Sequence, residues 1–426
     1  MNNRVLPLVA ALAVAAAGCN PTAEKMCPSD QRLCGGACVS LQSDPGNCGA
    51  CGAACGAGQG CSLGACVACG PNGEGCKAAV LAACFNADQV RAFDAALVQV
   101  GAPVDTSAGP GSLAALGGAI YVADMTGGVV ELVTPPKAPV LASVKGGSYN
   151  DLEHLGASGG LLWVSNAVVG SLVAVDPVAR KVLDELSLVS GSDAPNPLGF
   201  DFANNKAYVA LSAGLGSSPN GLAVVDLSSA PPWTVKPAVK RIDLSEFAHP
   251  GASPGVSRVL ASPDGKRVFV TMNDLYDATF QPVPGATGKL VVVDTATDAV
   301  VGGAVDLGAG CLNPSGMALA GSTLWIGCGY TQYNATFTAV TPVGGALLPV
   351  DVSGATPVPG AAVPMPNGHS IGSVRICGSR GYAGASDSGT LVTFDPSSGA
   401  ASTVNEQACP ANASGFSAVF DVECAP

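Results

Sequence analysis

Short apolar runs, most of them ending in Asp, recur along the chain from about residue 85 to the carboxyl terminus. Seven such runs end at Asp94, Thr134, Asp176, Asp226, Asp294, Asp351 and Asp395. Six of them follow a partner run, namely AIYVAD, LLWVSN, KAYVAL, RVFVTM, TLWIGC and RGYAGAS. Gly-rich turns separate the runs, most clearly in SPDGK at 262–266, which is a strong hairpin signal. Helical periodicity is confined to a short window at 77–84, so the pattern predicts a nearly all-β domain.

Strand pairs repeated at such intervals are typical of β-propellers. Residues 85–426 divide into seven units of about 49 residues, an ordinary blade size. The run that ends at Asp94 has no inner partner before it, and Phe416–Val422 offers a strand pair with no outer partner after it. Together the two ends complete one blade. We therefore predict an all-β, seven-bladed propeller over 85–426, closed by the carboxyl-terminal strands.

The segments LWVSNAVVGSLVAVDPVARKV and SPDGKRVFVTMND resemble the repeats of YVTN-type and surface-layer propellers. They resemble the NHL and gluconolactonase propellers more distantly. The resemblance extends over nearly all of 85–426 and implies the fold. It implies no activity, because propellers host many unrelated functions.

The amino terminus has the features of an export signal. Arg4 precedes the apolar run Val5–Ala17, which is too short to span a bilayer as a mature helix. The sequence Ala16-Ala17-Gly18-Cys19 resembles the lipobox of bacterial lipoproteins, which implies removal of residues 1–18 and acylation of Cys19. Ordinary secretory cleavage near Ala17 is the alternative. We expect an exported protein at the outer membrane or cell surface, held to the membrane by the lipid alone.

A cysteine-rich module follows, with eleven Cys from Cys27 to Cys84. Such a density is typical of domains in which disulfides replace a hydrophobic core. Two pairs with Cys-x2-Cys spacing, 48/51 and 66/69, also suit zinc, but export and the absence of nearby His favour disulfides. The segment CGGACVSLQSDPGNCGACGAAC, at 34–55, resembles the repeat of the stigma-specific protein family over about residues 27–66. The resemblance implies an extracellular spacer or binding module, and we assign residues 19–84 to it.

The cysteine count is consistent with a full set of disulfides. Of 17 Cys, removal of Cys19 leaves an even number. Cys69 and Cys76 bracket a short loop that one bond would close. In the propeller we expect the pairs Cys84–Cys424, Cys311–Cys328 and Cys377–Cys409, the first of which would lock the ring.

Composition excludes two classes of protein. The chain has a formal net charge of −12 and only 12% charged residues, so it lacks the basic surface that nucleic-acid binding needs. Its 48% hydrophobic content provides ample apolar surface to bury, which argues against disorder.

In a propeller, the loops between blades and those after the second strand of each blade open on one face around the channel. The candidate ligand-binding residues in these loops are Asn150, Asp151, Glu153, His154, Asn166, Asn273, Asn313, His369 and Asp387, together with Asp124 and Asp274. Their oxygens could hold a calcium ion, which could polarise a lactone or ester carbonyl, the chemistry that the gluconolactonase resemblance implies. The alternative is that these residues form turns by bonding the local backbone.

No motif in the sequence identifies a catalytic residue or a cofactor. It contains no G-x-S-x-G nucleophile elbow, no phosphate-binding glycine loop and no Cys-x-x-Cys-His. Two insertions, at 273–288 and 329–345, contain aromatic residues that either bind a ligand or pack under their own loops: Tyr276, Phe280, Tyr330, Tyr333 and Phe337. The sequence does not decide whether the protein binds a metal ion, and calcium is the candidate.

The sequence therefore favours a lipid-anchored surface protein whose propeller binds a protein, glycan or other ligand without catalysis. A calcium-dependent lactonase or esterase is the first alternative. A structural envelope or surface-layer component is the second.

Overall fold

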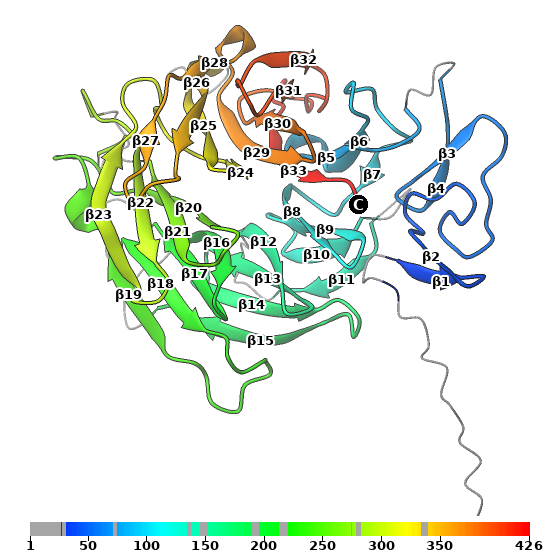
Figure 1. The fold of residues 1–426 in the computed structure, drawn as a ribbon, viewed down its shortest axis with the longest axis horizontal. Coiled ribbons are helices and arrows are strands. Elements are labelled where there is room, and N and C mark those ends of the chain that lie inside the picture. The colour runs from blue at the N-terminus through cyan, green and yellow to red at the C-terminus, as the bar shows by residue number, and fades with distance from the viewer. Residues whose placement is uncertain are drawn as a thin grey trace, which may run out of the picture.

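The computed structural model describes residues 27, 31–70, 75–133, 138–144, 151–189, 196–212, 220–273, 275–277, 283–333 and 340–426. Seven β-sheets of four or more strands are arranged in a ring, as Figure 1 shows, which confirms the predicted all-β, seven-bladed propeller. Helix in these residues is limited to three single turns: η1 (Phe85–Ala87), η2 (Ser245–Phe247) and η3 (Pro366–Gly368). None of the described helices is long or apolar enough to cross a membrane. The predicted signal peptide and Cys19 lie outside the described residues.

Each blade is an antiparallel sheet whose strands follow one another from the channel outward. The second blade contains, in that order, β8 (Pro110–Leu116), β9 (Ala119–Asp124), β10 (Val129–Leu132) and β11 (Val140–Ser143). The third contains β12 (Leu152–Ser158), β13 (Leu161–Asn166), β14 (Ser171–Asp176) and β15 (Lys181–Ser187). The fourth contains β16 (Pro197–Ala203), β17 (Lys206–Leu211), β18 (Gly221–Asp226) and β19 (Val239–Asp243).

The next three blades continue the same order around the ring. The fifth contains β20 (Val256–Ala261), β21 (Arg267–Met272), β22 (Lys289–Asp294) and β23 (Ala299–Asp306). The sixth contains β24 (Met317–Ala320), β25 (Thr323–Tyr333) and β26 (Val340–Asp351), with β27 (Val358–Pro359) and β28 (Val363–Pro364) both paired to β26. The seventh contains β29 (Ile371–Cys377), β30 (Arg380–Ala385), β31 (Leu391–Phe394) and β32 (Ala401–Asn405).

The closing blade combines both ends of the propeller. Its innermost strand is β33 (Val419–Cys424), followed by β5 (Val80–Cys84), β6 (Gln89–Phe93) and β7 (Val104–Asp105). The carboxyl end thus supplies one strand rather than the expected pair. The propeller also begins with β5, before the predicted boundary at residue 85. Every residue of β5 is buried on both faces, which gives a continuous apolar run without the alternation that marks a half-exposed strand.

The recurring Asp residues have a local structural role. In six blades the Asp accepts a hydrogen bond through Oδ1 from the N–H two residues later, at 2.8–3.0 Å. This Asx turn starts the connection to the outer strand. The recurring Asp in the sequence therefore marks the turn between the third and fourth strands of these six blades.

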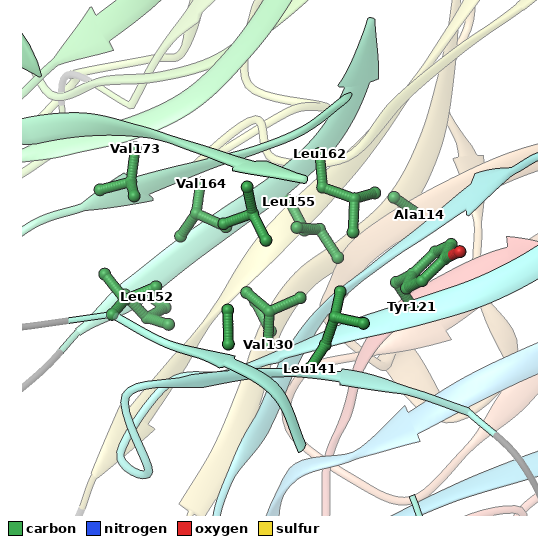
Figure 2. Close-up of a cluster of buried hydrophobic side chains, with 13 residues drawn as sticks. Ala114, Tyr121, Val130, Leu141, Leu152, Leu155, Leu162, Val164 and Val173 are labelled. Carbon is green, nitrogen blue, oxygen red and sulfur yellow. The ribbon is translucent and has the colours of Figure 1, made fainter. Parts of the chain in front are cut away.

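The hydrophobic core lies between neighbouring blades rather than inside any one of them. Figure 2 shows one cluster, in which Ala114, Tyr121, Val130 and Leu141 of the second blade meet side chains of the third. Similar clusters fill the other inter-blade spaces. Each sheet is thus buried on both faces, which accounts for the continuous apolar runs of the sequence.

The cysteine-rich module has two small hairpins, β1 (Arg32–Cys34) with β2 (Ala37–Val39), and β3 (Gln59–Ser62) with β4 (Ala65–Ala68). Its disulfides are 27–38, 34–51, 48–61, 55–66 and the predicted 69–76. The sulfurs of Cys48, Cys55 and Cys66 lie close together, but each is in a disulfide, so the zinc alternative fails. Leu63 and Val67 pack on the closing blade, so the module is docked rather than free.

The propeller has three disulfides, of which one matches the prediction. Cys311–Cys328 is confirmed, whereas the observed bonds Cys84–Cys409 and Cys377–Cys424 replace the expected 84–424 and 377–409. Because β5 and β33 are antiparallel, Cys84 lies opposite Val419 and Cys424 lies opposite Val80, at the two ends of the pair. Cys424 instead meets Cys377, which ends the innermost strand of the adjacent blade. The many disulfides are consistent with an extracellular or secreted protein.

Candidate functional site

The innermost strands of all seven blades line the channel, and every second side chain points into it. The strand registers place these side chains in two rings. The first ring, near the strand starts, contains Ser112, His154, Gly199, Arg258, Gly316, Ser373 and Asp421. The second ring contains Ala114, Gly156, Asp201, Leu260, Ala318, Arg375 and Glu423. Most of these residues border a cavity of about 250 Å³.

Glycine in the first ring makes room for its neighbours. A Cβ on Gly199 would lie 2.9 Å from the Ser257 carbonyl oxygen and 3.0 Å from both Cα and Cδ of Arg258. Any larger residue would therefore displace the Arg258 side chain. Gly199 lets Arg258 lie along the channel wall.

The channel carboxylates hold neighbouring blades together. Asp421 Oδ2 accepts the Leu113 N–H at 2.9 Å, and Asp201 Oδ2 accepts the Ala261 N–H at 2.8 Å, in each case from the next blade. Burial alone would raise the pKa of Asp421, but the charge of Arg375 and these hydrogen bonds outweigh it and lower the pKa. Burial raises the pKa of Asp201 despite its backbone donors.

The two hydroxyls of the first ring are already engaged. Ser112 donates to Asp421 at 3.1 Å and accepts the Leu155 N–H at 3.1 Å. Ser373 donates to Asp421 at 2.7 Å and accepts the Val422 N–H at 3.1 Å. His154 Nδ1 also lies 3.5 Å from Ser112 Oγ, but burial lowers the pKa of this imidazole to about 3, which makes it too weak a base to activate the hydroxyl. Both hydroxyls therefore act as structural links between blades.

The two channel arginines differ in their partners. Arg375 forms an ion pair with Glu423 at 3.2 Å. The charge of Glu423 raises the pKa of Arg375, while burial raises the pKa of Glu423. Arg258 borders the same cavity, and its guanidinium donates no hydrogen bond to any residue that the structure describes. Its charge acts on Glu153 and His154. Arg258 is therefore a channel cation whose guanidinium has donors available to a ligand.

The predicted candidates Asp151, Glu153 and His154 lie together at the channel mouth, beside Arg258. Burial raises the pKa of Glu153 to about 7, and the neighbouring Asp151 carboxylate adds to this effect. Asp151 Oδ1 is buried without a hydrogen-bond partner among the described residues, and burial raises its pKa as well. Burial, together with the charges of Arg258 and Arg375, lowers the pKa of His154 so far that its imidazole is neutral at physiological pH.

We predict a pH-dependent stability that originates in Glu153. Its pKa is higher in the folded chain than in the unfolded one, so the folded state holds the proton more tightly. The free energy of unfolding is therefore expected to fall by about 3 kcal/mol as the pH rises from about 4.5 to about 7. Glu153→Gln should flatten this part of the profile, whereas Glu246→Gln, at an exposed site, should leave it unchanged. Chemical unfolding at several pH values measures the effect, and parallel wild-type and Glu153→Gln profiles would contradict it.

His369 and Asp387, predicted separately, form a pair at the corresponding place in the seventh blade. His369 Nδ1 lies 3.1 Å from Asp387 Oδ2 and 3.1 Å from Ser388 Oγ. Asp387 Oδ1 accepts the Ser370 N–H at 3.0 Å. The hydroxyl nearest His369 Nε2 is that of Thr390, at 3.4 Å, and Thr390 is only 1% exposed. A substrate cannot reach this hydroxyl, so the cluster fixes the turn instead of forming a catalytic triad.

The remaining candidates are local. Asn166 accepts the Val169 N–H at 3.3 Å, Asn273 accepts the Ser257 hydroxyl at 2.9 Å, and Asn313 donates to the Gly329 carbonyl at 3.1 Å. The Asn166 bond fits the turn-forming alternative, whereas the bonds of Asn273 and Asn313 each join residues 16 positions apart. Asn150 and Asp274 lie outside the described residues. Asp124 faces away from the channel, between two blades.

Among the aromatic residues of the two insertions, Tyr276 and Tyr330 pack edge to face, with ring centroids 6.1 Å apart. Burial raises the pKa of Tyr276 to about 12. The two loops thus support each other across neighbouring blades. Phe280 and Phe337 lie outside the described residues.

Sequence reasoning missed the polar side chains of the innermost strands: Asp201, Arg258, Arg375, Asp421 and Glu423. These strands are short, and most are interrupted by a bulge near their start. The signal was present as a charged residue in four of the six strands that precede the partner runs, as in SRVLA and SVRIC. In a propeller, that strand lines the channel.

Comparison with known proteins identifies the amino-terminal module and the architecture of the rest. Residues 11–79 match the Stigma-specific STIG1-like protein family. The STIG1-like module therefore precedes the propeller. A comparison with curated proteins gives no match.

Solved structures share the propeller fold at low sequence identity. A putative 6-phosphogluconolactonase from Bacteroides uniformis has a TM-score of 0.52 at 11% identity, covering 82% of this chain and 99% of its own. Its counterpart from Bacteroides fragilis has a TM-score of 0.52 at 11% identity, with coverages of 82% and 97%. A catalytically inactive virginiamycin B lyase from Staphylococcus aureus has a TM-score of 0.50 at 12% identity, with coverages of 71% and 87%. At these identities the likeness concerns the fold alone.

Proposed function

We propose that this chain is an exported, lipid-anchored surface protein whose propeller binds a small anionic ligand at the mouth of its channel without catalysing a reaction. The observation that carries the proposal is the Arg258 guanidinium, which borders the channel cavity and donates to no described residue. The nearby carboxylates Asp201 and Asp421 are occupied by backbone N–H groups.

The chemistry around Arg258 suits an anion. A guanidinium presents its N–H groups as a planar fork that matches a carboxylate or phosphate. The neutral His154 ring adds a polar group beside it, and Phe200 packs edge to face on that ring at 4.8 Å. A cavity of about 250 Å³ admits a small molecule, or the acidic end of a glycan or peptide. A protein and a glycan, the two partner classes expected from the sequence, can each offer such an acidic end.

Anchoring through Cys19 rests on the lipobox-like sequence and on cysteine pairing. The sixteen other cysteines form eight disulfides, so Cys19 has no thiol partner left within the chain. Metabolic labelling with palmitate tests the anchor, and labelling that persists in Cys19→Ser would contradict it.

We expect carboxylates and phosphate to bind through Arg258. Gluconate, galacturonate and inorganic phosphate should each raise the melting temperature of the wild-type chain, whereas neutral glucose should not. Arg258→Gln removes the fork and should weaken binding about tenfold or more, as measured by calorimetry. The matched control is Arg180→Gln, because Arg180 is exposed and donates only to the Val140 carbonyl.

Two results would contradict the binding proposal. Anion binding that survives in Arg258→Gln would place the ligand elsewhere on the molecule. A lack of binding by all three anions at millimolar concentration would remove the anionic ligand class altogether.

A lactone or ester hydrolase is the second candidate, favoured by Glu153. A carboxyl with a pKa near 7 suits a general base that activates water. Hydrolysis of glucono-lactone that is lost in Glu153→Gln, and retained in Glu246→Gln, would decide for this candidate.

A further inference from the structure

Two buried carboxylates lie together in the second blade, outside the channel. Asp124 ends β9, and Glu131 is on the neighbouring β10, opposite Val122. Both acidic residues are 0% exposed. Val122 belongs to the core cluster shared with the closing blade, so the pair faces the junction between these two blades.

The connection between β7 and β8 supplies further oxygens. Ser107 donates to Glu131 through its hydroxyl at 2.5 Å and through its N–H at 3.1 Å. The same N–H lies 3.3 Å from Asp124 Oδ2. Asp124 Oδ1 and Thr106 Oγ1, however, have no hydrogen-bond partner among the described residues, although Thr106 is only 7% exposed. Neither carboxylate forms an ion pair with a described Lys, Arg or His.

Comparison between blades shows that the fold itself does not need this charge. The strand registers give the residue equivalent to Glu131 in the third to seventh blades as Val173, Ala223, Val291, Leu348 and Val392. All five are apolar and at most 2% exposed, and only the closing blade also has a charged residue there, Arg91. A carboxylate in such a position costs several kcal/mol of folding free energy unless it is compensated.

We propose that Asp124 and Glu131, with the hydroxyls of Thr106 and Ser107, bind a divalent cation, for which Ca²⁺ is the best match. All four side chains offer oxygen, the donor that hard cations prefer. The cation supplies the missing countercharge and gives the orphaned Asp124 and Thr106 oxygens a partner. It also ties the β7–β8 connection to the second blade, next to the blade where the ring closes.

Calcium titration of the EDTA-treated full chain tests the site. Calorimetry at pH 7 should show about one calcium bound per chain. Calcium should also raise the melting temperature, by an amount that grows with the logarithm of the ratio of calcium concentration to dissociation constant. Absence of binding by the wild-type chain would overturn the proposal.

Two substitutions introduce the residues that the third blade has at the equivalent positions. Because the propeller already accommodates these residues there, the variants are expected to fold. Glu131→Val copies Val173, and Asp124→Asn copies Asn166, the equivalent last residue of β13. Each should keep the propeller's circular dichroism and weaken calcium binding about 100-fold or more. Asp151→Asn, at the channel mouth, should leave calcium binding unchanged. Binding that is lost in Asp151→Asn and kept in Glu131→Val would place the cation in the channel and overturn the assignment.

Discussion

Replacing both Cys84 and Cys409 with Ala is expected to lower the free energy of unfolding by about 5 to 6 kcal/mol. The bond joins residues 325 positions apart, so it removes more freedom from the unfolded chain than the other disulfides do. It also links β5 to the connection that leads into β33, the two strands that close the ring. Since a domain of this kind has a net stability of only about 5–15 kcal/mol, the loss is a large fraction of the total.

The matched control is the double substitution of Cys311 and Cys328. All four cysteines are buried, so each double variant removes two buried sulfurs. The 311–328 bond spans only 17 positions, for which loop closure gives about 3 kcal/mol. Guanidinium unfolding without reductant measures both losses. Equal losses would show that loop closure does not explain the stabilisation.

Asp421→Ala is expected to cost about 3–5 kcal/mol of unfolding free energy. Asp421 accepts hydrogen bonds from the Ser112 and Ser373 hydroxyls and from the Leu113 N–H, which come from the blades on its two sides. Alanine leaves these donors unpaired in a buried channel, and it removes a negative charge near Arg375. Asp421→Asn retains one acceptor oxygen, so its cost should be smaller.

Asp226→Ala provides the comparison for Asp421. Asp226 is exposed and accepts the Ser228 N–H in a turn, so its loss should cost less than about 1 kcal/mol. Denaturant unfolding of the three variants ranks the effects. If Asp421→Ala costs no more than Asp226→Ala, the channel hydrogen bonds do not hold the blades together.

The number of blades could be predicted from the sequence because six of the seven blades repeat the same Asx turn. The Asp at 176, 226 and 294 follows four consecutive apolar residues, and that combination is visible without a structure. The boundary at residue 85 was wrong because β5 belongs to a blade whose inner strand is more than 300 residues away. A pairing of this kind depends on the closed ring and leaves no local signal.

The sequence predicted the residues of the candidate site only where titratable side chains lie in or directly after a loop. Asp151, Glu153 and His154 follow a loop and could be recognised from their composition. Arg258 and Asp421 lie within strands, where polar residues are ordinarily taken to face solvent. Arg258 and Asp421 face a common cavity only because the seven blades form a closed ring around the channel. The difference between the expected and the observed disulfide pairs has the same origin. Because β5 and β33 are antiparallel, Cys84 and Cys424 lie at opposite ends of the strand pair and cannot bond to each other.

The docked STIG1-like module determines how the molecule would respond to mechanical force. A pull on the amino terminus first meets the contact of Leu63 and Val67 with the closing blade, and the hydrogen bond from Gly75 to Asp94. Tension that passes these contacts reaches β5, which lies between β33 and β6. It then reaches Cys84, whose covalent bond transfers the load to Cys409. The ring is thus protected against being unravelled by a force applied at its amino-terminal end.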